Sequence, residues 1–191
     1  MDKKKFSIII PAYAEEENIL QLLNQIDDAF IDKKNIEIVL VDDGSPISLN
    51  GIIECEKYRF EIKVISNKYN LGQSKSIEVG LKNSTGEIVG LIDADCQNPP
   101  SELKKLYDFY ILNNFDAVIS FRKDRKDESL RKIISKLANV ILKIFTKSKF
   151  KDLGSSLKII KRDCLESLTF KGDMHRFISP MLQARGYSIA E

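Results

Sequence analysis

The sequence has few of the residues that mark a disulfide-bonded, zinc-bearing or His-rich protein. Among its 191 residues there is one histidine, His175, and there are three widely separated cysteines, Cys55, Cys96 and Cys164. The cysteines form no CxxC or Cys/His cluster, so we expect neither a disulfide framework nor a zinc site, and a reducing cytosol fits this composition.

Long hydrophobic runs are also missing. The basic start of the chain is followed only by the short apolar run Phe6–Ile10 before Pro11. A secretory signal needs a longer apolar region, so we expect no secretion. No run reaches the roughly eighteen apolar residues that would predict a membrane-spanning helix. Neither GxxxxGK[ST] nor GxGxxG occurs, which disfavours a P-loop enzyme and a dinucleotide-binding protein.

The near-neutral net charge of +2 conceals an uneven distribution. Residues 122–162 contain fourteen Lys or Arg and four Asp or Glu. Such a segment is either a solvated, Lys-rich face or a surface for an anionic partner. Within it, residues 129–149 carry apolar side chains at helical spacing between basic ones. This pattern predicts an amphipathic helix that either packs on its own sheet or lies at a membrane interface.

Short Ile- and Val-rich runs alternate with helical patterns along the chain. The runs predict strands at Phe6–Ile10, Ile36–Val41, Ile62–Ser66, Ile88–Ile92 and Ala117–Ser120. The helical patterns lie at Ile19–Phe30, Ile52–Tyr58, Ile77–Leu81 and Leu103–Tyr110. Nearly continuous hydrophobicity is typical of strands buried on both faces. The alternation therefore predicts an α/β fold with a mainly parallel central sheet flanked by helices.

Polar clusters follow the first four predicted strands. They are Pro11–Glu15, Asp42–Ser45, Asn67–Gln73 and Asp93–Gln97. Ligands of open α/β sheets gather at the carboxyl ends of the strands. We therefore expect the four clusters to form one site.

The sharpest of these clusters is Asp93-Ala-Asp95, a DxD motif. Two carboxylates two residues apart at a strand end repel one another, and a divalent cation relieves that repulsion. Mg²⁺ and Mn²⁺ prefer such oxygen ligands and commonly join them to substrate phosphates. Gln97 is a candidate third ligand from the same loop. The alternative is a turn with two solvated acids.

The other clusters carry weaker signals. Asp42-Asp43-Gly-Ser places acceptors for a base or a ribose, but the same residues are ordinary turn formers. Tyr13 is a candidate for stacking on a base, and Glu15 either binds the edge of the base or favours a helix N-terminus. Ser74, after Asn70-Leu-Gly72, is a plausible helix N-cap.

In this order, the motifs resemble family 2 glycosyltransferases, in particular the branch of dolichol-phosphate mannose synthase and its bacterial polyprenyl-phosphate relatives. The likeness runs through Phe6–Asn18, Val41–Ser45, Asn70–Gly72, Asp93–Pro100 and on to Lys161-Arg162, nearly the whole chain. Two positions depart from the family pattern: Ala14 stands where Asn is common, and Cys96 where Leu is usual. The resemblance implies a nucleotide-diphospho-sugar transferase (GT-A, Rossmann-like) fold. It also implies a single catalytic domain over residues 1–191, which we expect to be truncated at its C-terminus.

The resemblance implies a role for each motif. It places Pro11, Tyr13, Glu15, Asp42, Asp43 and Asp93 around the nucleotide of a UDP- or GDP-linked donor. It places Asp93, Asp95 and Gln97 at Mg²⁺ or Mn²⁺ and the diphosphate. Arg122, Arg131 and Ser135, with Asp95, are the implied catalytic residues, meeting the phosphates of donor and acceptor.

The expected acceptor is a polyprenyl phosphate. It brings an ionised nucleophile, so a metal-dependent, inverting displacement needs no general base. We expect no nucleic-acid partner, and a protein peripheral to the cytoplasmic face of a membrane, with a possible anchor in the full-length chain. Two alternatives stay open: a saccharide or surface-polymer acceptor, for which Asp152 is the candidate base, and a catalytically silent nucleotide-binding domain.

Overall fold

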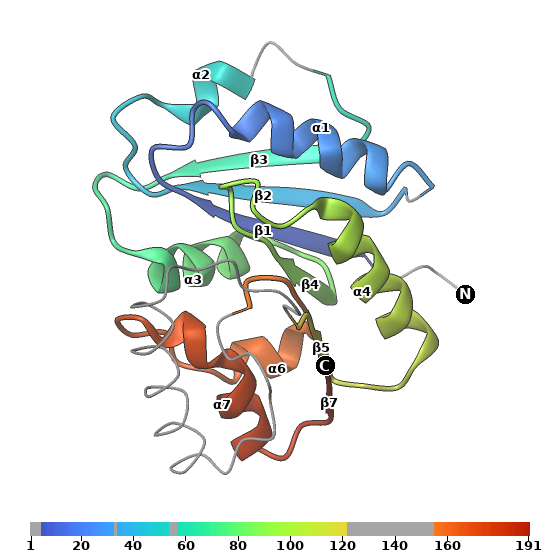
Figure 1. Cartoon of the computed structure of the whole chain (residues 1–191). Coiled ribbons are helices and arrows are strands. Elements are labelled where there is room, and N and C mark those ends of the chain that lie inside the picture. Colours follow the sequence, from blue (N-terminus) through green and yellow to red (C-terminus); the bar gives the residue numbers. More distant parts are fainter. Residues whose placement is uncertain (1–4, 33, 54–56, 122–154) are drawn as a thin grey trace, which may run out of the picture.

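The computed structural model describes residues 5–32, 34–53, 57–121 and 155–191, which form a seven-stranded sheet with helices on both faces (Figure 1). The strands are β1 (Phe6–Ala12), β2 (Ile36–Asp42), β3 (Glu61–Ser66), β4 (Ile88–Leu91), β5 (Ala117–Ile119), β6 (Lys158–Lys161) and β7 (Ile189–Ala190). The helices are α1 (Ile19–Ala29), α2 (Leu49–Ile53), α3 (Gln73–Asn83), α4 (Pro100–Leu112), α6 (Arg162–Glu166), α7 (Ile178–Ala184) and the 3₁₀ helix η1 (Met174–Phe177).

The sheet is mostly parallel, as the sequence predicts. Its strand order is β3-β2-β1-β4-β6-β5-β7. The pairs β1–β2, β1–β4, β2–β3 and β5–β7 are parallel, whereas β6 is antiparallel to both of its neighbours, β4 and β5. The four parallel strands β1–β4 therefore have their carboxyl ends at one edge of the sheet. The antiparallel strand β6 begins at that edge.

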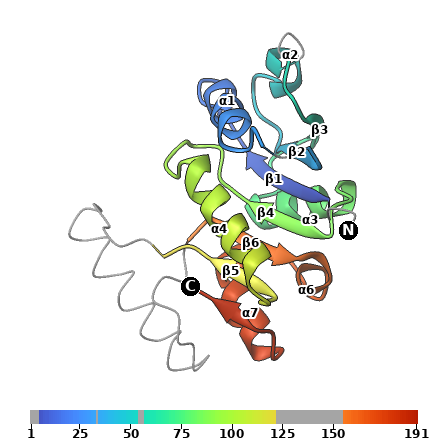
Figure 2. The same cartoon turned by 90° about the vertical axis from the view of Figure 1, so that its right-hand side faces the viewer.

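The two faces of the sheet bury separate hydrophobic cores because neighbouring residues of a strand point to opposite faces. Ile8 and Ile10 of β1 pack in one core with residues of α1 and α4, while Ile9 packs in the other with residues of α3, α6 and α7. Figure 2 shows α1 and α4 on one side of the sheet and α3 and α6 on the other. β1, β2, β4 and β5 are accordingly buried on both faces, which is the reason for their nearly continuous hydrophobicity, while β3 at the sheet edge is partly exposed.

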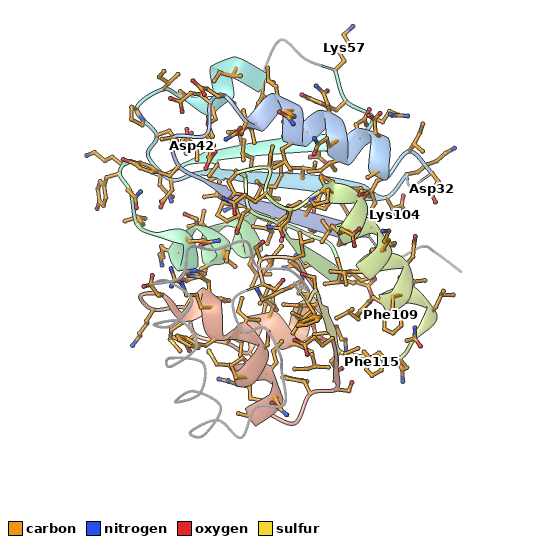
Figure 3. All side chains as sticks on the ribbon, viewed as in Figure 1. Asp32, Asp42, Lys57, Lys104, Phe109 and Phe115 are labelled. Atoms are coloured by element: carbon orange, nitrogen blue, oxygen red, sulfur yellow. The ribbon has the colours of Figure 1, made fainter. Side chains whose placement is uncertain are left out.

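Side chains outside the sheet tie the helical layer together (Figure 3). Lys104 of α4 makes ion pairs with Asp108 of the same helix, at 2.5 Å, and with Asp32 after α1, at 3.8 Å. At the far end of α4 the rings of Phe109 and Phe115 are stacked, with centroids 6.1 Å apart.

Three details of the predicted secondary structure are wrong. β6 was not anticipated as a strand. Tyr58 lies outside α2, which ends at Ile53. The N-cap of α3 is Gly72, with a positive φ of 87°, rather than Ser74. Within the described ranges, no helix is both long and apolar enough to cross a bilayer.

Candidate active site

The four polar clusters predicted from the sequence meet at the carboxyl ends of β1–β4. They line a cavity of about 260 Å³, here called the loop cavity, to which every cluster contributes. Its lining residues are Pro11, Ala12, Tyr13, Glu15, Asp43, Asn70, Gly72, Gln73, Ser76, Asp93, Ala94 and Asp95. The prediction of one site at this edge is confirmed.

Asp43 organises the wall of the loop cavity that follows β3. Its side chain is 2% exposed, and its carboxylate accepts hydrogen bonds from Asn67 Nδ2 at 2.7 Å, Leu71 N at 3.0 Å and Gly72 N at 2.8 Å. These bonds fix the loop that leads into α3. Asp43 thus lines the cavity and shapes it at the same time.

Asp42, the neighbouring acid, has a different setting. It is equally buried, but its two carboxylate oxygens accept hydrogen bonds from Ser45 N at 2.9 Å and Leu49 N at 3.2 Å, and it does not line the loop cavity. Asp42 therefore holds the turn after β2 and the start of α2. Figure 3 shows it at the edge of the sheet where these loops gather.

Backbone geometry brings the loops after β1, β2 and β3 close together. A Cβ on Gly44 would lie 2.6 Å from the carbonyl carbon of Tyr69, so only glycine permits this approach. Ala14 has a φ of 55°, in the left-handed region, and its amide donates to Ser45 Oγ at 3.0 Å. Because Asn tolerates the left-handed region better than Ala, the Asn expected at position 14 has a physical reason.

Tyr13 and Glu15 stand at the mouth of the loop cavity. The Tyr13 ring is 48% exposed, as a stacking platform for a planar ligand requires. The Glu15 carboxylate accepts from Asn18 Nδ2 at 2.7 Å, and its carbonyl accepts from the amides of Asn18 and Ile19, where α1 begins. Glu15 therefore stabilises the start of α1 while it lines the cavity, and its contact with a base stays a prediction.

The DxD carboxylates lie on the opposite wall, after β4. The Asp93 carboxylate accepts from Gln73 Nε2 at 2.6 Å, and Asp95 Oδ1 accepts from the backbone amide of Gln97 at 3.1 Å. The Gln97 side chain is exposed and is not among the lining residues. Its place as a metal ligand stays a prediction.

The electrostatics of this wall favour a cation. Burial, followed by the negative charges of Asp95 and Glu15, raises the pKa of the Cys96 thiol. Two hard carboxylates fit Mg²⁺ or Mn²⁺, which use few protein ligands and complete their shell with phosphate oxygens. In the described part of the chain no group of three or more His, Cys, Asp or Glu gathers into a self-sufficient metal site.

A second cavity, of about 250 Å³, adjoins the first and shares Pro11, Gln73 and Asp93 with it. We call it the cationic cavity, because Lys158 and Arg176 line it, together with His175. Its other lining residues are Ile77, Leu91, Ile92, Ser155, Ser156 and Ile178.

Sequence reasoning missed the residues of the cationic cavity. Lys158, 4% exposed, begins β6 and donates through Nζ to the carbonyl of Ser155. A lone lysine inside the apolar run Leu157–Ile160 was a usable signal, since lysine is almost never fully buried without a partner. His175 was considered only as evidence against a His-rich metal site.

His175 is anchored from across the fold. Its backbone amide donates to Ser74 Oγ at 2.9 Å, and its Nδ1 lies 2.9 Å from the same hydroxyl. Burial, followed by the charge of Arg176, lowers the pKa of His175 to about 4. The ring is therefore neutral at pH 7, and the Ser74 hydroxyl, predicted to cap α3, instead holds η1 against that helix.

The remaining predicted site residues, Arg122, Arg131 and Ser135, lie outside the described residues. So do Asp152 and the amphipathic segment 129–149.

Comparison with known sequences gives a consistent set of relatives. The sequence model described as "Glycosyl transferase family 2" matches residues 7–169. A dodecaprenyl-phosphate galacturonate synthase of Rhizobium johnstonii is 29% identical over 180 residues, covering 91% of this chain and 53% of the relative. An undecaprenyl-phosphate 4-deoxy-4-formamido-L-arabinose transferase of Pseudomonas aeruginosa is 33% identical over 186 residues, covering 95% and 54%. The chain thus spans about half the length of these relatives.

Solved structures share the fold at lower identity. A mannosyltransferase of Pyrobaculum calidifontis, determined with GDP-Man and Mn²⁺, superposes with a TM-score of 0.73 at 18% identity, covering 98% of this chain and 54% of that one. Glucosyl-3-phosphoglycerate synthase of Mycobacterium tuberculosis, determined with UDP, also gives 0.73 at 20% identity, covering 98% and 69%. The expected GT-A fold is confirmed.

Proposed function

The chain belongs to glycosyl transferase family 2, and from this premise we propose that it is the sugar-transferring part of an enzyme that uses a nucleotide-sugar donor and a polyprenyl phosphate acceptor. One observation carries the proposal: the loops after all four parallel strands, with both DxD carboxylates, line a single cavity. The acceptor class is supported by the names of the two relatives, both of which are polyprenyl-phosphate sugar transferases.

The donor nucleotide occupies the loop cavity in this proposal. Tyr13 stacks on the base, and Asp43 with the loop that it fixes contacts the base or the ribose. Pro11 and Glu15 complete this wall. Asp42 acts on the nucleotide only through the turn that it holds, because neither of its oxygens faces the cavity. A uridine and a guanosine donor both fit this proposal.

Asp93 and Asp95 would hold Mg²⁺ or Mn²⁺. The ion, when bound, offsets the negative charge that collects on the departing nucleoside diphosphate. Asp93 is fixed from behind by Gln73, at 2.6 Å, and Asp95 by the amide of Gln97, at 3.1 Å. Both carboxylates are therefore oriented before the donor arrives, which lowers the reorganisation needed for the reaction.

The transfer itself is a displacement at the anomeric carbon of the sugar. An oxygen of the acceptor phosphate forms a bond to that carbon while the bond to the donor diphosphate breaks, and the nucleoside diphosphate leaves with the electron pair. Attack from the side opposite the leaving group inverts the anomeric centre. The acceptor oxygen is already ionised at pH 7, so no protein base removes a proton. Arg122, Arg131 and Ser135 are proposed to hold the phosphates.

A lipid acceptor places the reaction at a membrane surface. We propose that the protein acts peripherally on the cytoplasmic face, where nucleotide sugars are present, and that the basic segment 129–149 faces the headgroups.

The test is a transfer assay with the full-length protein. Labelled UDP- and GDP-sugars are incubated with Mn²⁺ and either polyprenyl phosphate or soluble saccharides. We expect label in the lipid fraction with polyprenyl phosphate, and none with Asp95→Asn. Label transferred only to saccharides would move the assignment to the alternative acceptor. No transfer to any acceptor, with nucleotide still bound, would favour a silent nucleotide-binding domain.

A further inference from the structure

The lining of the cationic cavity combines cationic, polar and apolar residues. Lys158, His175 and Arg176 line it, together with Ser155 and Ser156. Its apolar lining residues are Ile77, Leu91, Ile92 and Ile178, and Leu91 is the register partner of Lys158 on the neighbouring strand. Among the described lining residues, Asp93 is the sole carboxylate, and the loop cavity shares it.

The positive charge of this cavity is built into the fold. Lys158 pairs with Leu91 of β4 and with Ile119 of β5, so its backbone sits in the middle of the sheet, and its side chain is 4% exposed. Burying an ammonium costs several kcal/mol unless hydrogen bonds or an anion compensate. Lys158 Nζ donates to the carbonyl of Ser155, and Lys158 also lines the cavity, where an anionic ligand would be a further partner for its charge.

Arg176 adds a second cation, and this residue is exposed. Its guanidinium makes no ion pair with any carboxylate of the described residues. The segment that carries it is anchored by the two contacts of His175 with Ser74 and by the hydrogen bond from Arg176 N to Asp173 O at 3.2 Å. The charge is thus presented at the cavity by a fixed backbone.

We propose that the cationic cavity binds the phosphate of the acceptor together with the first isoprene unit attached to it, Lys158 and Arg176 contacting the phosphate. The inference rests on the proposed function and adds residues that the sequence motifs do not name. Lys158 and Arg176 match a phosphate monoester, and the apolar lining residues match the adjoining hydrocarbon.

The position of the cavity suits this role. It meets the loop cavity at Pro11, Gln73 and Asp93, where the sugar–diphosphate bond of the donor is expected. A phosphate held by Lys158 and Arg176 would lie next to these shared residues. The reacting groups of donor and acceptor would then be close together, as the transfer requires. His175, neutral at pH 7, offers at most one further ring N–H donor.

The proposal is tested by binding measurements with Arg176→Gln. Arg185→Gln is the matched control, because Arg185 is exposed, follows α7 in the same region and lies outside the cavity. The probes are geranyl phosphate, inorganic phosphate, UDP and GDP, titrated by calorimetry. Loss of one charge-assisted contact should weaken geranyl phosphate about tenfold or more. The control should bind it as the unsubstituted protein does, and both variants should keep their nucleotide affinity within about twofold.

Other outcomes overturn the inference. Equal geranyl phosphate affinity in Arg176→Gln and the unsubstituted protein would exclude Arg176 from the site. A parallel loss of UDP or GDP affinity would assign the cavity to the donor. Equal affinities for geranyl and inorganic phosphate would remove the isoprene from the proposal. Lys158→Gln serves as a second variant, after its melting temperature has shown that it folds.

Transfer assays separate this inference from the proposed function. If the unsubstituted full-length protein transfers no sugar to polyprenyl phosphate, the proposed function fails. If it does transfer and Arg176→Gln leaves the KM for polyprenyl phosphate unchanged, the proposed function stands and the assignment of the cationic cavity fails.

Discussion

The two adjacent aspartates after β2 offer a matched experiment. Both are 2% exposed and both accept hydrogen bonds from backbone amides, but only Asp43 lines the loop cavity. Changing each to Asn removes the charge and turns one acceptor oxygen into a donor. We expect both variants to lose stability and only Asp43→Asn to lose nucleotide affinity.

The expected loss of stability follows from the hydrogen bonds that each aspartate accepts. In Asp43→Asn the amide oxygen can serve the two donors that share Oδ1, Asn67 Nδ2 and Leu71 N, which leaves the new NH₂ facing Gly72 N. Losing one hydrogen bond to a charged acceptor costs about 1.5–3 kcal/mol of unfolding free energy. The same loss is expected for Asp42→Asn, where Asn keeps one of two amide partners. For a chain of this length, it lowers the melting temperature by roughly 3–12 °C.

Urea unfolding gives the stability of each variant, and calorimetric titration with UDP and GDP in the presence of Mn²⁺ gives the affinity. Asp43→Asn should bind at least about tenfold more weakly, because both a cavity contact and the shape of the loop before α3 are lost. If Asp42→Asn loses as much affinity as Asp43→Asn, the division between a structural and a cavity-lining acid is wrong. Full affinity in a folded Asp43→Asn would exclude it from the nucleotide site.

Three further predictions follow from other contacts. Ala14→Gly should raise the unfolding free energy by about 1 kcal/mol, because glycine adopts a φ of 55° without strain. As a control, Ala29→Gly at the end of α1 should lower the unfolding free energy, because glycine is the poorer helix former. Urea unfolding measures both changes. Glu37 is buried in β2, and although burial raises its pKa, hydrogen bonds from Lys5, Ser7 and Thr85 outweigh this and hold the pKa far below the usual 4.5. The ionised Glu37 therefore stabilises the fold above pH 4.5, and this stabilisation is lost as the pH falls. Glu37→Gln should lower the unfolding free energy at pH 7 by about 2–4 kcal/mol, and its unfolding free energy should fall less in acid than that of the unsubstituted protein. Urea unfolding at several pH values measures both effects. Asp95→Asn should abolish the dependence of UDP or GDP affinity on Mn²⁺, and unchanged dependence in calorimetry would remove Asp95 from the metal site.

Local patterns predicted the part of the fold that they control. The runs that became β1, β2, β4 and β5 are buried on both faces, which is why nearly continuous hydrophobicity identified them, whereas β3 at the edge of the sheet is partly exposed. Polar, turn-forming residues directly after the predicted strands located the four polar clusters at the carboxyl ends of β1–β4. The DxD motif and Asp43 were therefore found from sequence, and the structure brings them to one cavity.

Long-range packing decided the rest. β6 was missed because Lys158 and Lys161 interrupt its apolar run, and its place between β4 and β5 depends on pairing with strands far away in the sequence. Ser74 looked like a helix cap because capping is a local use for a hydroxyl. Its actual partner, His175, is 101 residues away. No local pattern contains that contact.

The reversed direction of β6 explains how one edge of the sheet serves two cavities. Parallel strands bring only their carboxyl ends to that edge, and in β1–β4 these ends carry the acidic and aromatic residues of the loop cavity. β6 runs antiparallel, so it contributes its beginning instead. The pairing of Lys158 with Leu91 sets the lysine two residues before Asp93 in the register of the sheet, and the preceding Ser155 and Ser156 join the same wall. A cation is thereby placed beside the acidic edge by sheet pairing, which is rigid, rather than by a loop. In the proposed reaction both the leaving group and the acceptor carry phosphate, and a single antiparallel strand places a lysine beside the acidic edge of the sheet.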